Sequence, residues 1–127
     1  MKHLLLGAVA ALACLTPTAV TAQEAGEVVL AFYKGGSWLY PATVRSVSGK
    51  WVTVDWDTGT TSVVDAIYIG PFDWGVGSNI FCKWPVDGKF YPARITRMGD
   101  DGRSLNIVWT DDNTAARTTT GKCRSAG

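Results

Sequence analysis

The sequence predicts an all-β protein of two tandem five-stranded barrels that follow a cleaved N-terminal segment. Three observations support this fold class: apolar side chains alternate with period two along short segments, tight turns separate these segments, and the second half of the chain repeats the pattern of the first. Five short strands within about 50 residues favour a small, strongly bent barrel. A closed barrel also removes exposed sheet edges.

The N-terminus has the pattern of a secretory signal peptide. Lys2 supplies a positive charge, residues 4–15 form an apolar stretch too short for a membrane span, and small or tolerated residues lead up to Ala22. We therefore expect cleavage after Ala22 and a periplasmic or secreted protein. Two alternatives stay open: residues 1–22 remain attached, or Cys14 carries a lipid, although the residues before Cys14 match a lipobox poorly.

The rest of the chain contains two copies of one unit. Residues 26–44 align with residues 77–95 at a constant offset of 51, and residues 52–56 align with residues 105–109 at an offset of 53. Self-similarity of this kind indicates repeated structural units. The predicted organisation is residues 1–22 as signal peptide, 23–70 as the first repeat, 71–76 as a linker and 77–127 as the second repeat.

Each strand is predicted by its alternation and by the turn that ends it. Gly, Ser and Asp at residues 34–37, 48–49 and 57–59 mark turns, because these residue types favour turn backbone conformations. The strands of the first repeat are expected at residues 28–33, 38–47, 50–56, 60–64 and 67–69. The second repeat follows the same order, and no segment has the periodicity and caps of an α-helix.

The charge of the expected mature chain is balanced overall but uneven along its length. Residues 23–76 carry three Lys or Arg and six Asp or Glu, whereas residues 77–127 carry eight and five. Overall neutrality argues against a general polyanion binder. The opposite charges of the two halves either attract each other across an interface or take part in binding a partner.

Two cysteines remain after the expected cleavage. An even pair in an oxidising compartment favours a disulfide. Cys82 lies on the first strand of the second repeat, and Cys123 falls where the fifth strand is expected beside it. We predict that they are bonded, which closes a loop of about 40 residues and stabilises a barrel whose core is thin. Two free buried thiols are the alternative.

The motifs resemble those of the Tudor/Agenet family, and the resemblance covers most of residues 23–127. The first repeat matches over residues 26–33, 38–44 and 52–57. The resemblance implies SH3-type, Tudor-like barrels and a binding module rather than an enzyme. In the second repeat the matching motifs are Gly77-x-x-Ile80-x-Cys82-x-Trp84, Gly88-x-Phe90-Tyr91-Pro92-Ala93-x-Ile95 and Ile107-x-Trp109-x-Asp111-Asp112.

The resemblance also implies an aromatic cage, in which ring faces hold a cationic side chain such as a methylated Lys or Arg. The acidic position of the first repeat falls on Thr58, a departure from the family pattern that Asp57 beside it can offset. Lys89 replaces an aromatic residue in the second repeat and would repel a cation, so the first repeat is expected to be the better cation site. The cage positions are Tyr33, Trp38, Tyr40, Trp56 and Asp57 in the first repeat and Trp84, Tyr91, Trp109 and Asp111 in the second.

We expect the four rings of the first repeat to converge on one side of their barrel. At least two of them should be accessible to solvent, because exposing large rings costs hydrophobic free energy and indicates a ligand. The alternative is that the rings only complete a thin core.

Catalysis is not expected from residues 23–127. The only histidine, His3, precedes the expected cleavage site, so the mature chain has no imidazole for general base work or metal binding. The carboxylate pairs at residues 100–101 and 111–112 lie in predicted turns, where Asp is favoured for backbone reasons. We expect no catalytic residue, no cofactor, no metal and no transmembrane segment in the mature chain.

We therefore predict a non-catalytic module that recognises a protein or peptide through its aromatic pockets. A glycan or cell-wall polymer is an alternative ligand, because aromatic faces stack on sugars. Single-stranded nucleic acid is a second alternative, with Trp84 and Trp109 as stacking platforms. Export and the acidic first repeat weigh against it. The basic residues available to nucleic acid are Arg94, Arg97, Arg103, Arg117, Lys122 and Arg124.

Overall fold

The computed structural model describes residues 23–127, so the expected signal peptide, the expected cleavage after Ala22 and Cys14 lie outside the described residues. Over this range the chain is all-β, and no helix is long and apolar enough to cross a membrane. Two short 3-10 helices occur, η1 and η2. The elements in chain order are β1 (Val28–Phe32), β2 (Trp38–Ser48), β3 (Trp51–Trp56), β4 (Thr61–Asp65), η1 (Ala66–Tyr68), β5 (Ile69–Pro71), β6 (Asn79–Lys83), β7 (Phe90–Met98), β8 (Ser104–Trp109), β9 (Ala115–Thr119), η2 (Thr120–Lys122) and β10 (Cys123–Ala126).

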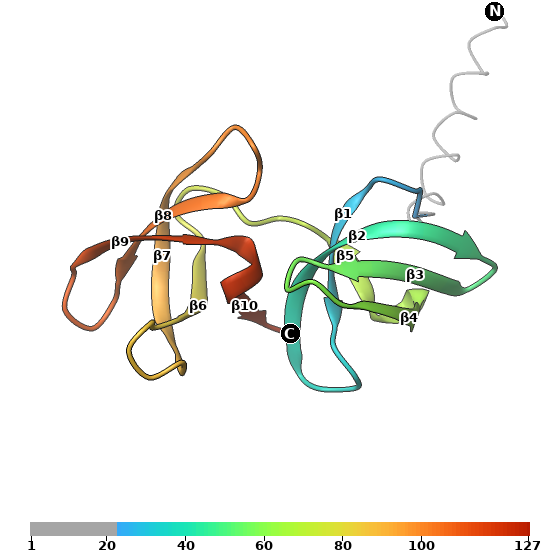
Figure 1. The fold of residues 1–127 in the computed structure, drawn as a ribbon, viewed down its shortest axis with the longest axis horizontal. Coiled ribbons are helices and arrows are strands. Elements are labelled where there is room, and N and C mark those ends of the chain that lie inside the picture. Colours follow the sequence, from blue (N-terminus) through green and yellow to red (C-terminus); the bar gives the residue numbers. More distant parts are fainter. Residues whose placement is uncertain (1–22) are drawn as a thin grey trace, which may run out of the picture.

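The ten strands form two halves with the same antiparallel pairing (Figure 1). The first half has the strand order β5-β1-β2-β3-β4, and the second has β10-β6-β7-β8-β9. The register of β2 against β3 shifts between Val44 and Ser46, and that of β7 against β8 shifts at the equivalent place, between Ile95 and Arg97. Such bulges bend a strand and increase its twist, which curls each sheet on itself.

The fifth strand of the first half begins later than the pattern predicted. Ala66–Tyr68 form the 3-10 helix η1, and the Asp65 carboxylate caps it by accepting a hydrogen bond from the Ile67 amide at 3.1 Å. β5 therefore starts at Ile69, which pairs with Ala31 of β1. The alternation of residues 67–69 predicted a strand because three residues of a 3-10 turn are too few to display a helical period.

The alternating apolar residues of each half form its buried core. Six pairs of repeat-equivalent residues are almost completely shielded from solvent, so the predicted period-two pattern is confirmed. In five of the six pairs the second half has the larger side chain. The six pairs are Val29 and Ile80, Ala31 and Cys82, Ala42 and Ala93, Val44 and Ile95, Val52 and Leu105, and Val54 and Ile107.

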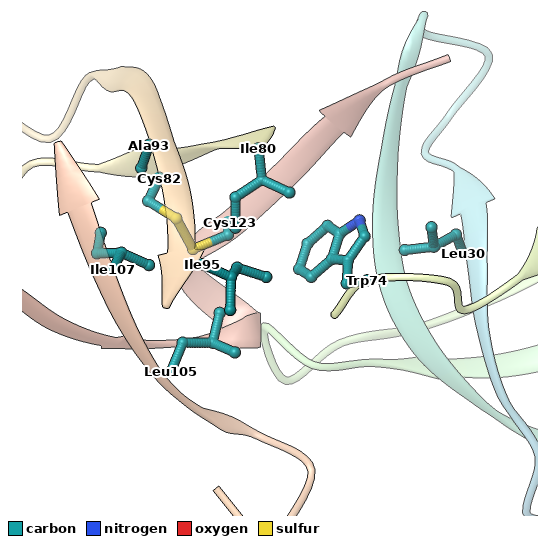
Figure 2. Close-up of a cluster of buried hydrophobic side chains, with 9 residues drawn as sticks. All are labelled: Leu30, Trp74, Ile80, Cys82, Ala93, Ile95, Leu105, Ile107 and Cys123. Carbon is teal, nitrogen blue, oxygen red and sulfur yellow. A yellow bond between two sulfur atoms is a disulfide. The ribbon is translucent and has the colours of Figure 1, made fainter. Parts of the chain in front are cut away.

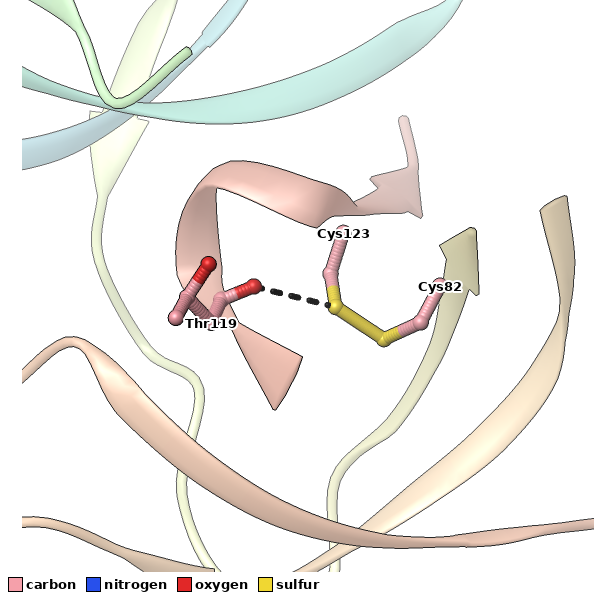
Figure 3. Close-up of a disulfide and its surroundings, with 3 residues drawn as sticks. All are labelled: Cys82, Thr119 and Cys123. Carbon is pink, nitrogen blue, oxygen red and sulfur yellow. Dashed lines mark hydrogen bonds between the residues drawn. A yellow bond between two sulfur atoms is a disulfide. The ribbon is translucent and has the colours of Figure 1, made fainter. Parts of the chain in front are cut away.

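The predicted disulfide between Cys82 and Cys123 is present (Figure 3). It joins β6 to β10 with a Cα–Cα distance of 4.0 Å, and both cysteines are buried. The contact of 3.4 Å drawn between Cys123 Sγ and the Thr119 carbonyl is a sulfur–oxygen contact, because a bonded sulfur carries no hydrogen. In the first half, Ala31 and Ile69 pair at the equivalent positions.

The two halves share a strand and part of a core. β10 pairs with β6 of its own half and also with β2 of the first half, through Ser125 opposite Leu39 and Ala126 opposite Trp38. Leu30 of β1 and Trp74 of the connecting segment are buried among the core residues of the second half (Figure 2). The segment expected to be a simple linker therefore contributes a large side chain to the second core.

Polar contacts also join the halves. The Asp57 carboxylate accepts a hydrogen bond of 2.6 Å from the Thr120 hydroxyl and forms an ion pair of 3.3 Å with Arg103. The Asp57 side chain is only 6% exposed, which strengthens both contacts relative to a solvated pair. The opposite charges of the two halves thus meet directly at one point of the interface.

Gly121 is expected to be essential for the close approach of η2 to the Asp57 backbone. A Cβ atom at residue 121 would lie 2.6 Å from the Asp57 carbonyl oxygen, which is backbone and cannot rotate away. Gly121→Ala should therefore lower the free energy of unfolding by about 1–3 kcal/mol, as overpacked sites do. Urea denaturation measures the loss. Gly70→Ala is the matched control, because nothing lies within 4 Å of its Cβ position. Equal stability of the two variants would contradict the prediction.

Candidate functional site

A pocket on the second half gathers the predicted cage residues of that repeat. Its volume is about 370 Å³. Trp84, Tyr91, Trp109 and Asp111 all line it, as the resemblance implied. The other lining residues, which were not among the predicted cage positions, are Asp112, Thr114 and Ala115. We call this cavity the acidic pocket.

The turn between β8 and β9 supplies the acidic rim. It contains residues 110–114, one residue more than the equivalent turn at residues 57–60. Asn113 takes a left-handed backbone conformation at φ 64°, which Asn tolerates, and its amide donates to the Trp109 carbonyl at 2.8 Å. The repeat alignment ends at Trp109, so this longer turn and its lining residues Asp112 and Thr114 lay outside the aligned segments.

The aromatic wall of the acidic pocket is held in place by packing and one short hydrogen bond. Trp84 lies just after β6 and meets Tyr91 of β7 edge-on, with ring centroids 5.8 Å apart. The Tyr91 hydroxyl donates to the Asp87 carboxylate at 2.5 Å. This bond raises the pKa of Tyr91 and lowers the pKa of Asp87, so at neutral pH the phenol stays protonated and the carboxylate ionised.

The carboxylates of the rim give the pocket its negative charge. Hydrogen bonds from the hydroxyl and amide of Thr114 lower the pKa of Asp112, which keeps it ionised. Asp111 is exposed, and its charge adds to the rise in the Tyr91 pKa. Lys89, which was expected to repel a cation here, does not line the pocket. Ring faces beside fixed carboxylates are chemically suited to a cationic group.

The first-half rings Tyr33, Tyr40 and Trp56 form a packed cluster. Tyr33 lies edge-on to Tyr40 at 5.8 Å and to Trp56 at 5.1 Å between ring centroids. Trp56 is 3% exposed, belongs to the buried core, and donates a hydrogen bond of 2.9 Å to the Ser62 hydroxyl. Trp56 is therefore part of the scaffold, unlike its partly exposed equivalent Trp109.

Trp38 does not join this cluster, so the prediction that all four rings converge is wrong. Trp38 packs edge-on against Phe81 of the second half, with centroids 5.0 Å apart. The Arg124 guanidinium lies between two rings, 4.0 Å from the centroid of Trp38 and 3.8 Å from that of Phe90. It also donates a hydrogen bond of 2.9 Å to the Tyr40 hydroxyl.

The chain's own charges thus occupy the cage positions of the first half. Arg124 covers Trp38 and Tyr40, and the Lys34 ammonium lies 5.3 Å from the centroid of Tyr33. Asp57, the expected acidic partner, is engaged at the interface. The geometry therefore favours the acidic pocket of the second half as the candidate site. Among residues 23–127 no cluster of His, Cys, Asp and Glu could hold a metal ion.

Comparisons with known proteins concern the fold. No protein-family model matches the sequence, and neither does any curated protein. The crystal structure of the Crb2 tandem tudor domains is similar to this chain, with a TM-score of 0.55 and 16% identity over 84% of this chain and 83% of that one. The Arabidopsis thaliana AGDP1 AGD34 structure is 15% identical over 80% and 81% of the two chains, with a TM-score of 0.39. The likeness to the Crb2 domains shows that the chain has a Tudor-like fold.

Proposed function

We propose that this chain is an exported, non-catalytic module of two Tudor-like barrels that binds a protein or peptide through a cationic side chain held in the acidic pocket. The convergence of Trp84, Tyr91 and Trp109 with Asp111 around one cavity is the observation that supports this. Each cation–π contact contributes about 0.5–2 kcal/mol to binding. Trp84 is 43% exposed, so a ligand can reach its ring from solvent.

The export part of the proposal rests on the signal-peptide pattern of residues 1–22 and on the buried disulfide. Disulfides persist in oxidising compartments and are rare in reducing ones. The proposed ligand is therefore a protein or peptide of the periplasm or of the extracellular space. N-terminal sequencing or the intact mass of the exported protein tests the expected cleavage after Ala22.

Binding of short peptides to residues 23–127 tests the pocket. The peptides should differ only in one central residue, which is Lys, trimethyllysine, Arg, dimethylarginine or Gln. We expect at least one cationic peptide to bind. Trp84→Ala and Asp111→Asn should each lower the affinity for that peptide about tenfold, which corresponds to the loss of one strong contact. Fluorescence anisotropy measures the affinities.

Two controls match these variants. Trp51→Ala removes another exposed tryptophan, 49% exposed and in the first half, and Asp100→Asn removes another exposed carboxylate of the second half. Neither residue lines the pocket, so both variants should bind like the parent protein. If every cationic peptide binds no better than the Gln peptide, the proposed function is refuted. Binding of purified peptidoglycan in that case would favour the glycan alternative.

A further inference from the structure

A second cavity shares Trp84 and Trp109 with the acidic pocket. Its volume is about 430 Å³, and three basic side chains line it, those of Lys83, Arg117 and Lys122. Within the described part of the chain, none of its lining residues is an Asp or Glu. We call this cavity the basic groove. The two tryptophans thus take part in two adjoining cavities of opposite charge.

The charges of the basic groove are not neutralised by the described part of the chain. None of its three cations takes part in an ion pair among residues 23–127. Lys83 instead lies 5.6 Å from the ring centroid of Phe90. Three like charges around one cavity repel one another, and an anionic group bound there would relieve this repulsion. The groove is therefore complementary to an anion.

Strand β9 connects the two cavities. Thr114, just before β9, and Ala115 line the acidic pocket, whereas Ala116, Arg117 and Thr118 line the basic groove. β9 pairs with β8 and ends the strand order of the sheet. Extended chains rise by about 3.3 Å per residue. A peptide running alongside β9 would therefore pass from one cavity to the other within about two to four residues.

We propose that the acidic pocket and the basic groove together bind one extended peptide that carries a cationic side chain and, two to four residues away, an acidic side chain. This inference rests on the proposed function of the pocket. It adds a selectivity rule, since acidic neighbours of the cationic residue strengthen binding and basic neighbours weaken it. Alternate side chains of an extended peptide face the same way, so spacings of two and four residues fit best.

The same charges disfavour a nucleic-acid strand. A strand that follows the groove past Trp84 and Trp109 would bring its phosphates against the carboxylates of Asp111 and Asp112. Two of the basic residues first considered for nucleic acid are also engaged at the interface between the halves, namely Arg103 with Asp57 and Arg124 with Tyr40. A ligand with charges of both signs satisfies both cavities at once.

The test compares four labelled peptides on a Gly/Ser background. One carries the best-binding cationic residue alone, and a second adds Glu two and four residues to either side of it. A third carries the same four Glu at eight and ten residues to either side, and the fourth carries Lys in place of each Glu of the second. A single-stranded oligonucleotide of similar length is the fifth probe, and anisotropy at moderate salt measures each affinity.

Two matched triple variants locate the effect. Lys83→Gln, Arg117→Gln and Lys122→Gln together remove the charges of the groove. Lys89→Gln, Arg94→Gln and Arg97→Gln together remove the same amount of charge from exposed residues of the same half that line neither cavity. Thermal melts of both variants establish that they are folded.

The parent protein should bind the peptide with nearby Glu about fivefold more tightly than the peptide with the cation alone, as expected for one or two exposed charge pairs. The groove variant should lose this advantage while it binds the cation-only peptide at least as tightly as the parent protein does, because removing positive charges beside the pocket does not oppose a cation. The control variant should keep most of the advantage. Equal binding of the near-Glu and distant-Glu peptides would overturn the inference, and so would tighter binding of the oligonucleotide. Failure of the cation-only peptide to bind would instead refute the proposed function, and the inference with it.

Discussion

Replacing both Cys82 and Cys123 with alanine is expected to lower the free energy of unfolding by about 4 kcal/mol. The disulfide spans a sequence separation of 41 residues, and the chain-entropy estimate for a loop of that size has this magnitude. Small domains have a total stability of about 5–15 kcal/mol. The variant should therefore unfold at a much lower urea concentration than the oxidised parent protein, as measured by tryptophan fluorescence.

The first half offers a matched control for this experiment. Its residues at the equivalent positions are Ala31 and Ile69, which pair without a covalent bond. The double variant Cys82→Ala, Cys123→Ile copies that pair, so it restores apolar packing but not the cross-link. We expect it to remain far less stable than the oxidised parent protein. If it comes within about 1 kcal/mol of the parent, packing rather than the cross-link stabilises this half.

Trp56→Ala is expected to destabilise the protein by about 3–5 kcal/mol, the usual cost of truncating a buried aromatic residue. Trp56 is 3% exposed and its indole nitrogen is hydrogen-bonded to Ser62, so the variant loses packing and leaves the serine without this partner. Urea denaturation measures the change. Peptide binding to the acidic pocket, which lies in the other half, should persist below the unfolding transition.

Trp109→Ala is the matched comparison, because Trp109 holds the equivalent place in the second repeat. Trp109 is only partly buried and lines the acidic pocket. We expect Trp109→Ala to lower the free energy of unfolding by about 1–2 kcal/mol, because less of the Trp109 side chain is buried than of Trp56. The same variant should lose most of its affinity for the peptide. The opposite assignment, with Trp109 more important for stability and Trp56 for binding, would mean that the functional site lies in the first half.

Much of the fold was predictable because the same alternation of apolar residues, which is weak evidence in one segment, occurs in both repeats. Val54 and Ile107 each sit in a short alternating segment that alone indicates little more than a strand. Their alignment, and that of five other buried pairs, showed that the same face is apolar twice. The cage positions of the second repeat, Trp84, Tyr91 and Trp109, line one cavity because they lie within one half and do not depend on how the halves pack. The expectation that the first repeat would be the better cation site did not take account of Arg124.

The contacts between the halves were not predictable, since alternation describes one strand at a time. Leu30 points away from the core of its own half, and the pattern gave no sign that the second half would cover it. The stacking of Arg124 between Trp38 and Phe90 joins residues that are distant in the sequence and belong to different repeats. The cage positions assigned to Trp38 and Tyr40 therefore did not reveal that their neighbour would be an arginine of the same chain.

The position of β10 has a consequence for the order in which the protein can mature. β10 is the last of the ten strands to leave the ribosome, yet it completes the pairing of β2, one of the first strands to be synthesised. Until it arrives, Leu39 and Trp38 lack the partners that the finished protein provides. During synthesis from the N-terminus, the first half therefore cannot complete its contacts before β10 has been made. Cys123 travels on the same strand, so oxidation of the cysteine pair must also await this late segment.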